Sequence, residues 1–139
     1  MITLDNVSND NILPVTRAAA LLPSFIQDMA SYNAEQAVGE VHRNILSVLM
    51  RQFNLDPQGA MNRAYECHRG MQRKFIKLLD EVPSFGLEVD KAVSDYIFHL
   101  GCWVQGNLCC SFESGRYFGN KCLDVQRDGW VELLPSVKT

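Results

Sequence analysis

Three oxygen-bearing side chains recur at four-residue intervals in the first third of the sequence: Gln27, Ser31 and Glu35. On an α-helix, successive steps of four residues differ by about 40° around the axis, so the three side chains lie on one side. Such a set can offer three oxygen ligands to one hard cation, and Mg²⁺ accepts it while keeping water and phosphate oxygens as further ligands. Polar residues at this spacing also commonly form the solvated face of a helix, so the motif alone leaves both interpretations open.

A second segment with chemical potential follows a long helical pattern near the end of the sequence. It carries Arg116 and Tyr117 in a loop. The planar guanidinium of arginine binds phosphate oxygens in pairs, and a tyrosine hydroxyl can donate one more hydrogen bond. An isolated Arg-Tyr pair is uninformative. This pair is more informative because it follows a long predicted helix that begins after the turn at residues 83–86.

The spacing of apolar residues predicts four helices and no strand, because no segment shows a sustained two-residue alternation. Pro23 predicts a kink or a fresh helix start within the first of them. Asp56 and Pro57 have the residue types of an N-cap and a first helical position. We therefore predict an all-α fold with a loop over residues 1–13 and a tail over 120–139, the helices covering residues 14–38, 40–53, 57–79 and 88–112.

Composition limits the class of protein. The 139 residues are 47% hydrophobic and 21% charged with a net charge of −3, which is normal for a globular domain and argues against nucleic acid as a partner. The sequence has no membrane span and no secretory signal. The oligomeric state is left open.

The cysteines favour an intracellular, cytoplasmic protein with reduced thiols, because the chain has five of them and no C-x-x-C pair. A zinc site formed by His99, Cys102 and Cys109 is an alternative, although their spacing matches no closed zinc site.

Four blocks of the sequence belong together: 31–36 (SYNAEQ), 55–60 (LDPQGA), 82–86 (VPSFG) and 103–119 (WVQGNLCCSFESGRYFG). Their order and intervals resemble the fungal sesquiterpene synthases of the class I terpene cyclase family. The resemblance covers residues 14–119 and implies a partial terpene synthase domain, made of the C-terminal helices of the class I terpenoid synthase α-bundle.

The resemblance also implies a chemistry. By position, Gln27, Ser31 and Glu35 correspond to the family motif that binds one Mg²⁺, and Arg116 and Tyr117 to the pair that contacts the substrate diphosphate. The implied reaction is the Mg²⁺-dependent ionisation and cyclisation of an isoprenyl diphosphate, with farnesyl diphosphate favoured, and release of diphosphate.

The sequence departs from the family pattern in ways that keep other hypotheses open. Gln27 stands where the family usually has Asn or Asp, and the extra methylene shifts the amide oxygen by more than about 1 Å from where Mg²⁺ would need it. Cys110 stands where many relatives have tryptophan. Nothing before Pro14 matches the family's aspartate-rich motif. A catalytically inactive helical remnant that acts as an interaction protein, and a helical interaction module unrelated to terpenes, are therefore the alternatives.

Overall fold

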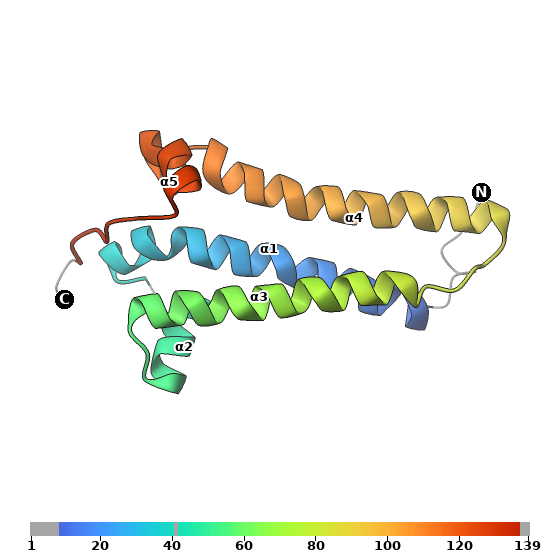
Figure 1. Ribbon diagram of the computed structural model, residues 1–139, viewed down its shortest axis with the longest axis horizontal. Coiled ribbons are helices and arrows are strands. Elements are labelled where there is room, and N and C mark those ends of the chain that lie inside the picture. The colour runs from blue at the N-terminus through green and yellow to red at the C-terminus, as the bar shows by residue number, and fades with distance from the viewer. Residues whose placement is uncertain (1–8, 41, 137–139) are drawn as a thin grey trace.

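The computed structural model describes residues 9–40 and 42–136, and helices account for most of them. No strand occurs in these residues, which confirms the predicted all-α class. Figure 1 shows the elements in order: α1 (Asn9–Val38), α2 (Ile45–Phe53), α3 (Pro57–Asp80), α4 (Leu87–Glu113), the 3-10 turn η2 (Gly119–Lys121) and α5 (Cys122–Asp128). None of the helices in this part of the chain is long and apolar enough to cross a membrane.

The first helix is the centre of the arrangement. α1 lies between α3 and α4 and packs against both, while α2 packs across the ends of α1 and α3 (Figure 1). α4 runs in the same direction as α1, and α3 runs in the opposite direction. Within the described residues, α3 and α4 do not approach each other within 8 Å between Cα atoms. Among the described helices, only α1 contacts both α3 and α4.

Small residues let the helices approach closely. Alanines are buried on both sides of the main contacts, at Ala18 and Ala19 of α1 and at Ala60 and Ala64 of α3. One apolar cluster joins α1, α2 and α3 at the end of α1 where the predicted metal motif lies. Its buried members are Tyr32, Leu46, Leu49, Ala60 and Ala64.

Local capping signals set the later helix boundaries. The Asp56 side chain accepts a hydrogen bond from the N–H of Gly59 at 2.7 Å, and Pro57 occupies the first helical position, as predicted. The predicted start of the second helix at residue 40 is wrong. That helix begins at Ile45 because the side chain of Asn44 caps it by accepting from the N–H of Leu46 at 2.9 Å.

The ends of the chain also differ from the prediction. Residues 1–8 lie outside the described part, but 9–13 belong to α1 rather than to a loop, and α1 passes through Pro14 and Pro23 without a fresh start. Each proline removes one backbone donor, yet the neighbouring Val15 and Leu22 are buried, so tertiary packing outweighs the local loss. The predicted tail contains η2 and α5 before it becomes irregular.

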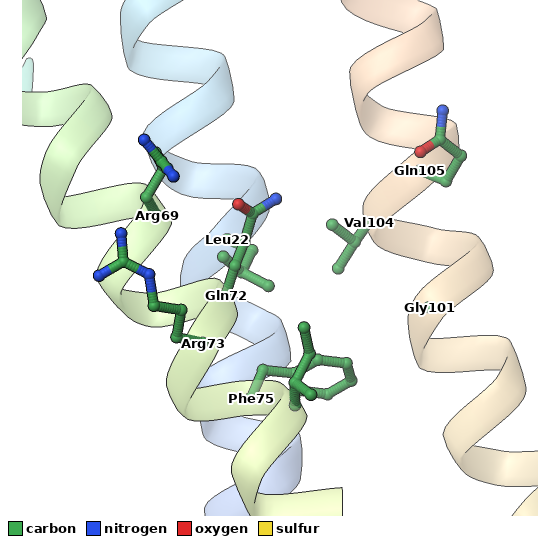
Figure 2. Close-up of a pocket in the computed structure, with 9 residues that line it drawn as sticks. Leu22, Arg69, Gln72, Arg73, Phe75, Gly101, Val104 and Gln105 are labelled. Carbon is green, nitrogen blue, oxygen red and sulfur yellow. The ribbon is translucent and has the colours of Figure 1, made fainter.

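An open cleft of about 430 Å³ lies between α3 and α4. Figure 2 shows Leu22 of α1 at its base, with Phe75 of α3 and Val104 of α4 reaching toward it from either side. Arg69 and Arg73 line its α3 side. The cleft is lined by apolar groups with polar groups at its edge, and it is separate from the motif residues.

Candidate metal and diphosphate site

The structure brings two of the three predicted metal ligands together at one point. Ser31 is buried and Glu35 is half-buried on consecutive turns of α1. The side-chain amide of Asn44 donates to Oε2 of Glu35 at 3.0 Å and makes a longer contact of 3.5 Å with Oγ of Ser31. Gln27 lies one turn earlier, where its side chain is exposed. Ser31 and Glu35 thus share one partner, whereas Gln27 extends into solvent.

Asn44 is the residue that the sequence analysis missed. Its side chain is only 1% exposed, and its amide nitrogen also donates to the backbone carbonyl of Asp28 at 2.8 Å. One carboxamide therefore caps α2 with its oxygen and gathers oxygens of α1 with its nitrogen. The available signal was an asparagine at the position before an apolar helix, which the predicted start at residue 40 concealed.

The donor set of this point suits a small divalent cation. Ser31 Oγ and Glu35 Oε2 both lie within 3.5 Å of the side-chain nitrogen of Asn44, so the two oxygens are gathered on the same side of α1. The hydrogen bond from Asn44 uses Oε2, which leaves Oε1 of Glu35 for a metal. Hydroxyl and carboxylate oxygens are the ligands that Mg²⁺ prefers. The residues present therefore fit the metal that the motif implies.

Asp28 adds negative charge beside the site. Its Oδ2 accepts a hydrogen bond from the N–H of Ile45 at 2.8 Å, which fixes the carboxyl at the start of α2. Burial raises the pKa of Asp28, the bond from Ile45 opposes this shift, and the charge of Glu35 adds to it. A cation bound between these carboxylates would relieve their repulsion.

The described residues contain no group of three or more His, Cys, Asp or Glu side chains that could hold a metal. The zinc alternative is therefore wrong for this part of the chain. His99 Nδ1 instead contacts the backbone oxygen of Asp95 at 2.6 Å, and Cys109 Sγ accepts from Gln105 at 3.4 Å. A cation site near Glu35 has to rely on hydroxyl and carboxamide oxygens as well as carboxylates.

The second predicted site lies in the loop between α4 and η2, which several contacts hold in place. The guanidinium of Arg116 lies over the ring of Tyr117, 5.4 Å from its centre. Phe118 stacks on Phe112 of α4 at 5.5 Å, and Gly119 donates to the carbonyl of Gly115 at 2.9 Å. The Arg116 side chain is exposed. The loop is held by its neighbours, and its cationic group faces solvent, as a site for an anion requires.

The two predicted sites lie at the same end of the molecule. In Figure 1, α4 ends close to α5, beside the C-terminal half of α1. Within the described residues, no hydrogen bond or ion pair joins Arg116 to Gln27, Ser31 or Glu35, and the backbone N–H of Arg116 donates to Ser114 at 3.3 Å. The helices that carry or precede the two sites, α1 and α4, pack against each other.

α4 presents a buried polar group to α1 that sequence reasoning also missed. Thr16 and Tyr96 contact each other through their hydroxyls at 3.0 Å, and the two helices run in the same direction. Asn107, eleven positions after Tyr96, therefore lies near the level of Gln27. Its Oδ1 atom is buried and has no hydrogen-bond partner in the described part of the chain. An acceptor of this kind is available to a water or a ligand group.

Comparison with known proteins gives one family for this chain. The model of terpene synthase family 2, C-terminal metal binding, matches residues 2–74, which include the motif on α1 and Asn44. Two sequences from Postia placenta are similar: sesquiterpene synthase 14, 48% identical over 81% of this chain, and Delta(6)-protoilludene synthase 8, 46% identical over 78%.

A third relative extends the similarity along almost the whole chain. A Delta(6)-protoilludene synthase of Stereum hirsutum is 35% identical over 96% of this chain, a span that includes the Arg116 loop. The aligned regions cover 32%, 31% and 39% of these three relatives. This chain thus spans about a third of the length of the relatives it matches.

Proposed function

The chain belongs to terpene synthase family 2, and from that premise we propose that it forms the metal-binding and diphosphate-binding part of a sesquiterpene synthase. The proposed substrate is an isoprenyl diphosphate, and farnesyl diphosphate is favoured because the similar proteins are named sesquiterpene and protoilludene synthases. The proposed metal is Mg²⁺, since the oxygen donors beside Asn44 suit it.

Each predicted residue has a place in this proposal. Glu35 and Ser31 hold the metal, and Gln27 turns inward from its exposed position to complete the set. Arg116 and Tyr117 donate to oxygens of the diphosphate from the other side. When bound, Mg²⁺ neutralises negative charge on the diphosphate as it leaves.

The proposed chemistry begins with cleavage of the bond between the first carbon of the isoprenyl chain and its diphosphate oxygen. Both electrons of that bond leave with the diphosphate, and an allylic carbocation remains. Charge-assisted hydrogen bonds from Arg116 stabilise the leaving group because its negative charge is greatest after the bond has broken. The carbocation then cyclises.

One observation carries the proposal: the amide of Asn44 holds the oxygens of Ser31 and Glu35 together on the buried side of α1. A solvated helix face, the alternative interpretation of this spacing, would leave both side chains in water. Pre-organised oxygens reduce the loss of side-chain freedom when a cation binds.

The experiment that tests the proposal is a chimera. Because this chain spans about a third of its relatives, residues 14–119 would replace the aligned region of the Postia placenta sesquiterpene synthase 14. We expect the chimera to form hydrocarbon products and release diphosphate from farnesyl diphosphate only when Mg²⁺ is present. Folded chimera without activity, beside an active parent enzyme, would contradict the proposal. Assay of the chain alone then reports what this part does unaided.

A further inference from the structure

The segment that follows α5 returns to α1 and is hydrogen-bonded there. We call residues 129–136 the C-terminal strap. Asn33 donates from its amide to the carbonyl of Glu132 at 2.9 Å and accepts at Oδ1 from the N–H of Leu134 at 2.8 Å. Gln36 donates from its amide to the carbonyl of Leu134 at 2.7 Å. These bonds join positions about a hundred residues apart.

The strap is held by its backbone rather than by buried side chains. Asn33 bonds one acceptor and one donor, two residues apart in the strap, and Gln36 is itself steadied by contacts of 3.2 and 3.3 Å with the backbone oxygen and Oδ1 of Asn33. Leu134 and Trp130 of the strap remain 51% and 72% exposed. The two carboxamides therefore form a specific cradle for the backbone of the strap.

The strap connects the two predicted sites through the chain. The Arg116 loop leaves the end of α4 and leads into η2 and α5, and α5 packs against α4. The strap then leads from α5 to the turn of α1 that contains Glu35 (Figure 1). The Arg116 loop is consequently anchored on both sides, by α4 before it and by the strap after it.

The strap does not cover the metal face. Asn33 follows Ser31 by two positions, which places the two side chains about 200° apart around the helix. The cradle of Asn33 and Gln36 thus lies on the opposite side of α1 from Ser31. Its contacts can fix the position of the Arg116 loop without competing for the ligands of the metal.

We propose that Asn33 and Gln36 are positioning residues. By holding the strap they fix the Arg116–Tyr117 loop relative to the metal motif, so that both sites engage the same diphosphate. This inference rests on the proposed function. It assigns the two carboxamides a role in diphosphate binding without contact with the ligand.

The test removes a strap bond without changing α1. Leu134→Pro deletes the N–H that Asn33 accepts, whereas Ser136→Pro places the same residue beyond the last bonded position and serves as the matched control. Trp130 reports attachment by fluorescence anisotropy in a Trp103→Phe background, because the chain has only two tryptophans. We expect Leu134→Pro to free Trp130 and Ser136→Pro to leave it held. Equal fluorescence anisotropy of Trp130 in both variants would show that the bond between Asn33 and Leu134 does not hold the strap.

Binding of Mg²⁺ with inorganic pyrophosphate, measured by calorimetry on the full chain, then separates positioning from general destabilisation. We expect Leu134→Pro to weaken binding about 10-fold in the wild-type background and to have no further effect once Arg116→Ala is present. Equal losses in both backgrounds, or no loss when the strap is free, would overturn the positioning role and leave the proposed function standing. A wild-type chain that binds no pyrophosphate with Mg²⁺ would overturn both.

Discussion

The motif region of α1 and the Arg116 loop differ in how much of their arrangement is fixed in advance. Ser31 is buried, and Asn44 holds its oxygen and that of Glu35 through one amide group. Arg116 is exposed and has an aromatic ring rather than a carboxylate beside its guanidinium. The proposed metal side is therefore set by internal hydrogen bonds, while the proposed diphosphate side is an exposed cation on a loop held by its neighbours.

Substitutions in the α1 motif and in the Arg116 loop should therefore have different effects on stability and binding. Loss of Glu35 on the buried side removes the one carboxylate of the proposed ligand set, and loss of its organiser Asn44 also costs folding stability. Loss of the exposed arginine costs binding energy alone, because water already solvates that side chain.

Removal of the carboxylate should have the largest effect. In the chimera, Glu35→Ala should lower product formation by at least about 100-fold, since the metal loses its only charged ligand in the motif. Glu40→Ala, five residues further at an exposed position, is the matched control and should leave product formation unchanged. Normal turnover by Glu35→Ala, measured by gas chromatography of the hydrocarbons, would show that Glu35 is not a ligand.

Removal of the organiser should be next. Asn44→Ala deletes the cap of α2 and leaves buried oxygens without their donor, so we expect a loss of about 2–4 kcal/mol in the free energy of unfolding. Asn44→Asp keeps a capping oxygen but loses the amide donor, and chemical denaturation of the two variants separates these roles. A loss below about 0.5 kcal/mol in Asn44→Ala would mean that the amide does not organise the site.

The exposed side should respond more weakly. Arg116→Ala should weaken binding of pyrophosphate in the presence of Mg²⁺ by about 10-fold and leave the free energy of unfolding almost unchanged, because its side chain is exposed. Arg127→Ala is a control, since that arginine is paired with Asp124 and Asp128 on α5. If both variants weaken pyrophosphate binding equally, Arg116 acts only through the net charge of the protein and not through a specific contact.

Gln27→Asn should have a small effect in the favourable direction. Asparagine restores the residue type usual in the family motif, and its shorter side chain keeps a carboxamide oxygen. We expect Mg²⁺ dependence of the chimera to be unchanged or improved by about 2- to 3-fold, within the range that a single neutral ligand can supply. A large loss of activity would contradict the placement of Gln27 in the motif.

The smallest effect concerns pH. Because the pKa of Asp28 is raised in the folded protein, the folded state binds its proton more tightly than the unfolded state does. Stability should therefore fall as pH rises from about 4 through the folded pKa. Asp28→Asn should flatten this dependence while keeping an acceptor for the N–H of Ile45. Thermal unfolding between pH 4 and 7 checks it, and an unchanged slope would contradict the shift.

Local signals made much of the fold predictable. The bounds of α3 and α4 agree with the prediction to about one residue, because Asp56, Pro57 and the turn at 82–86 act on their immediate neighbours. The passage of α1 through Pro23 was not predictable from local signals, because the neighbouring Leu22 is buried against other helices. Tertiary packing overrides local preference at these positions.

The candidate site divides in the same way. The spacing of Ser31 and Glu35 on one helix predicted that they lie on one side, and the structure brings both to Asn44. Their role as ligands, with that of Gln27, stays a prediction. The bonds from Asn44 to α1 and those that hold the strap could not be found from the sequence, because they join separate elements and leave no periodic pattern.

Isothermal titration of the full chain with Mg²⁺ and inorganic pyrophosphate tests most directly whether Ser31 and Glu35 share one divalent ion beside the Arg116 loop. We expect heat of binding only when Mg²⁺ and pyrophosphate are both present. We expect Glu35→Ala to abolish this heat and Glu40→Ala to retain it. Pyrophosphate binding that needs no metal, or that survives Glu35→Ala undiminished, would contradict a shared ion at this turn of α1.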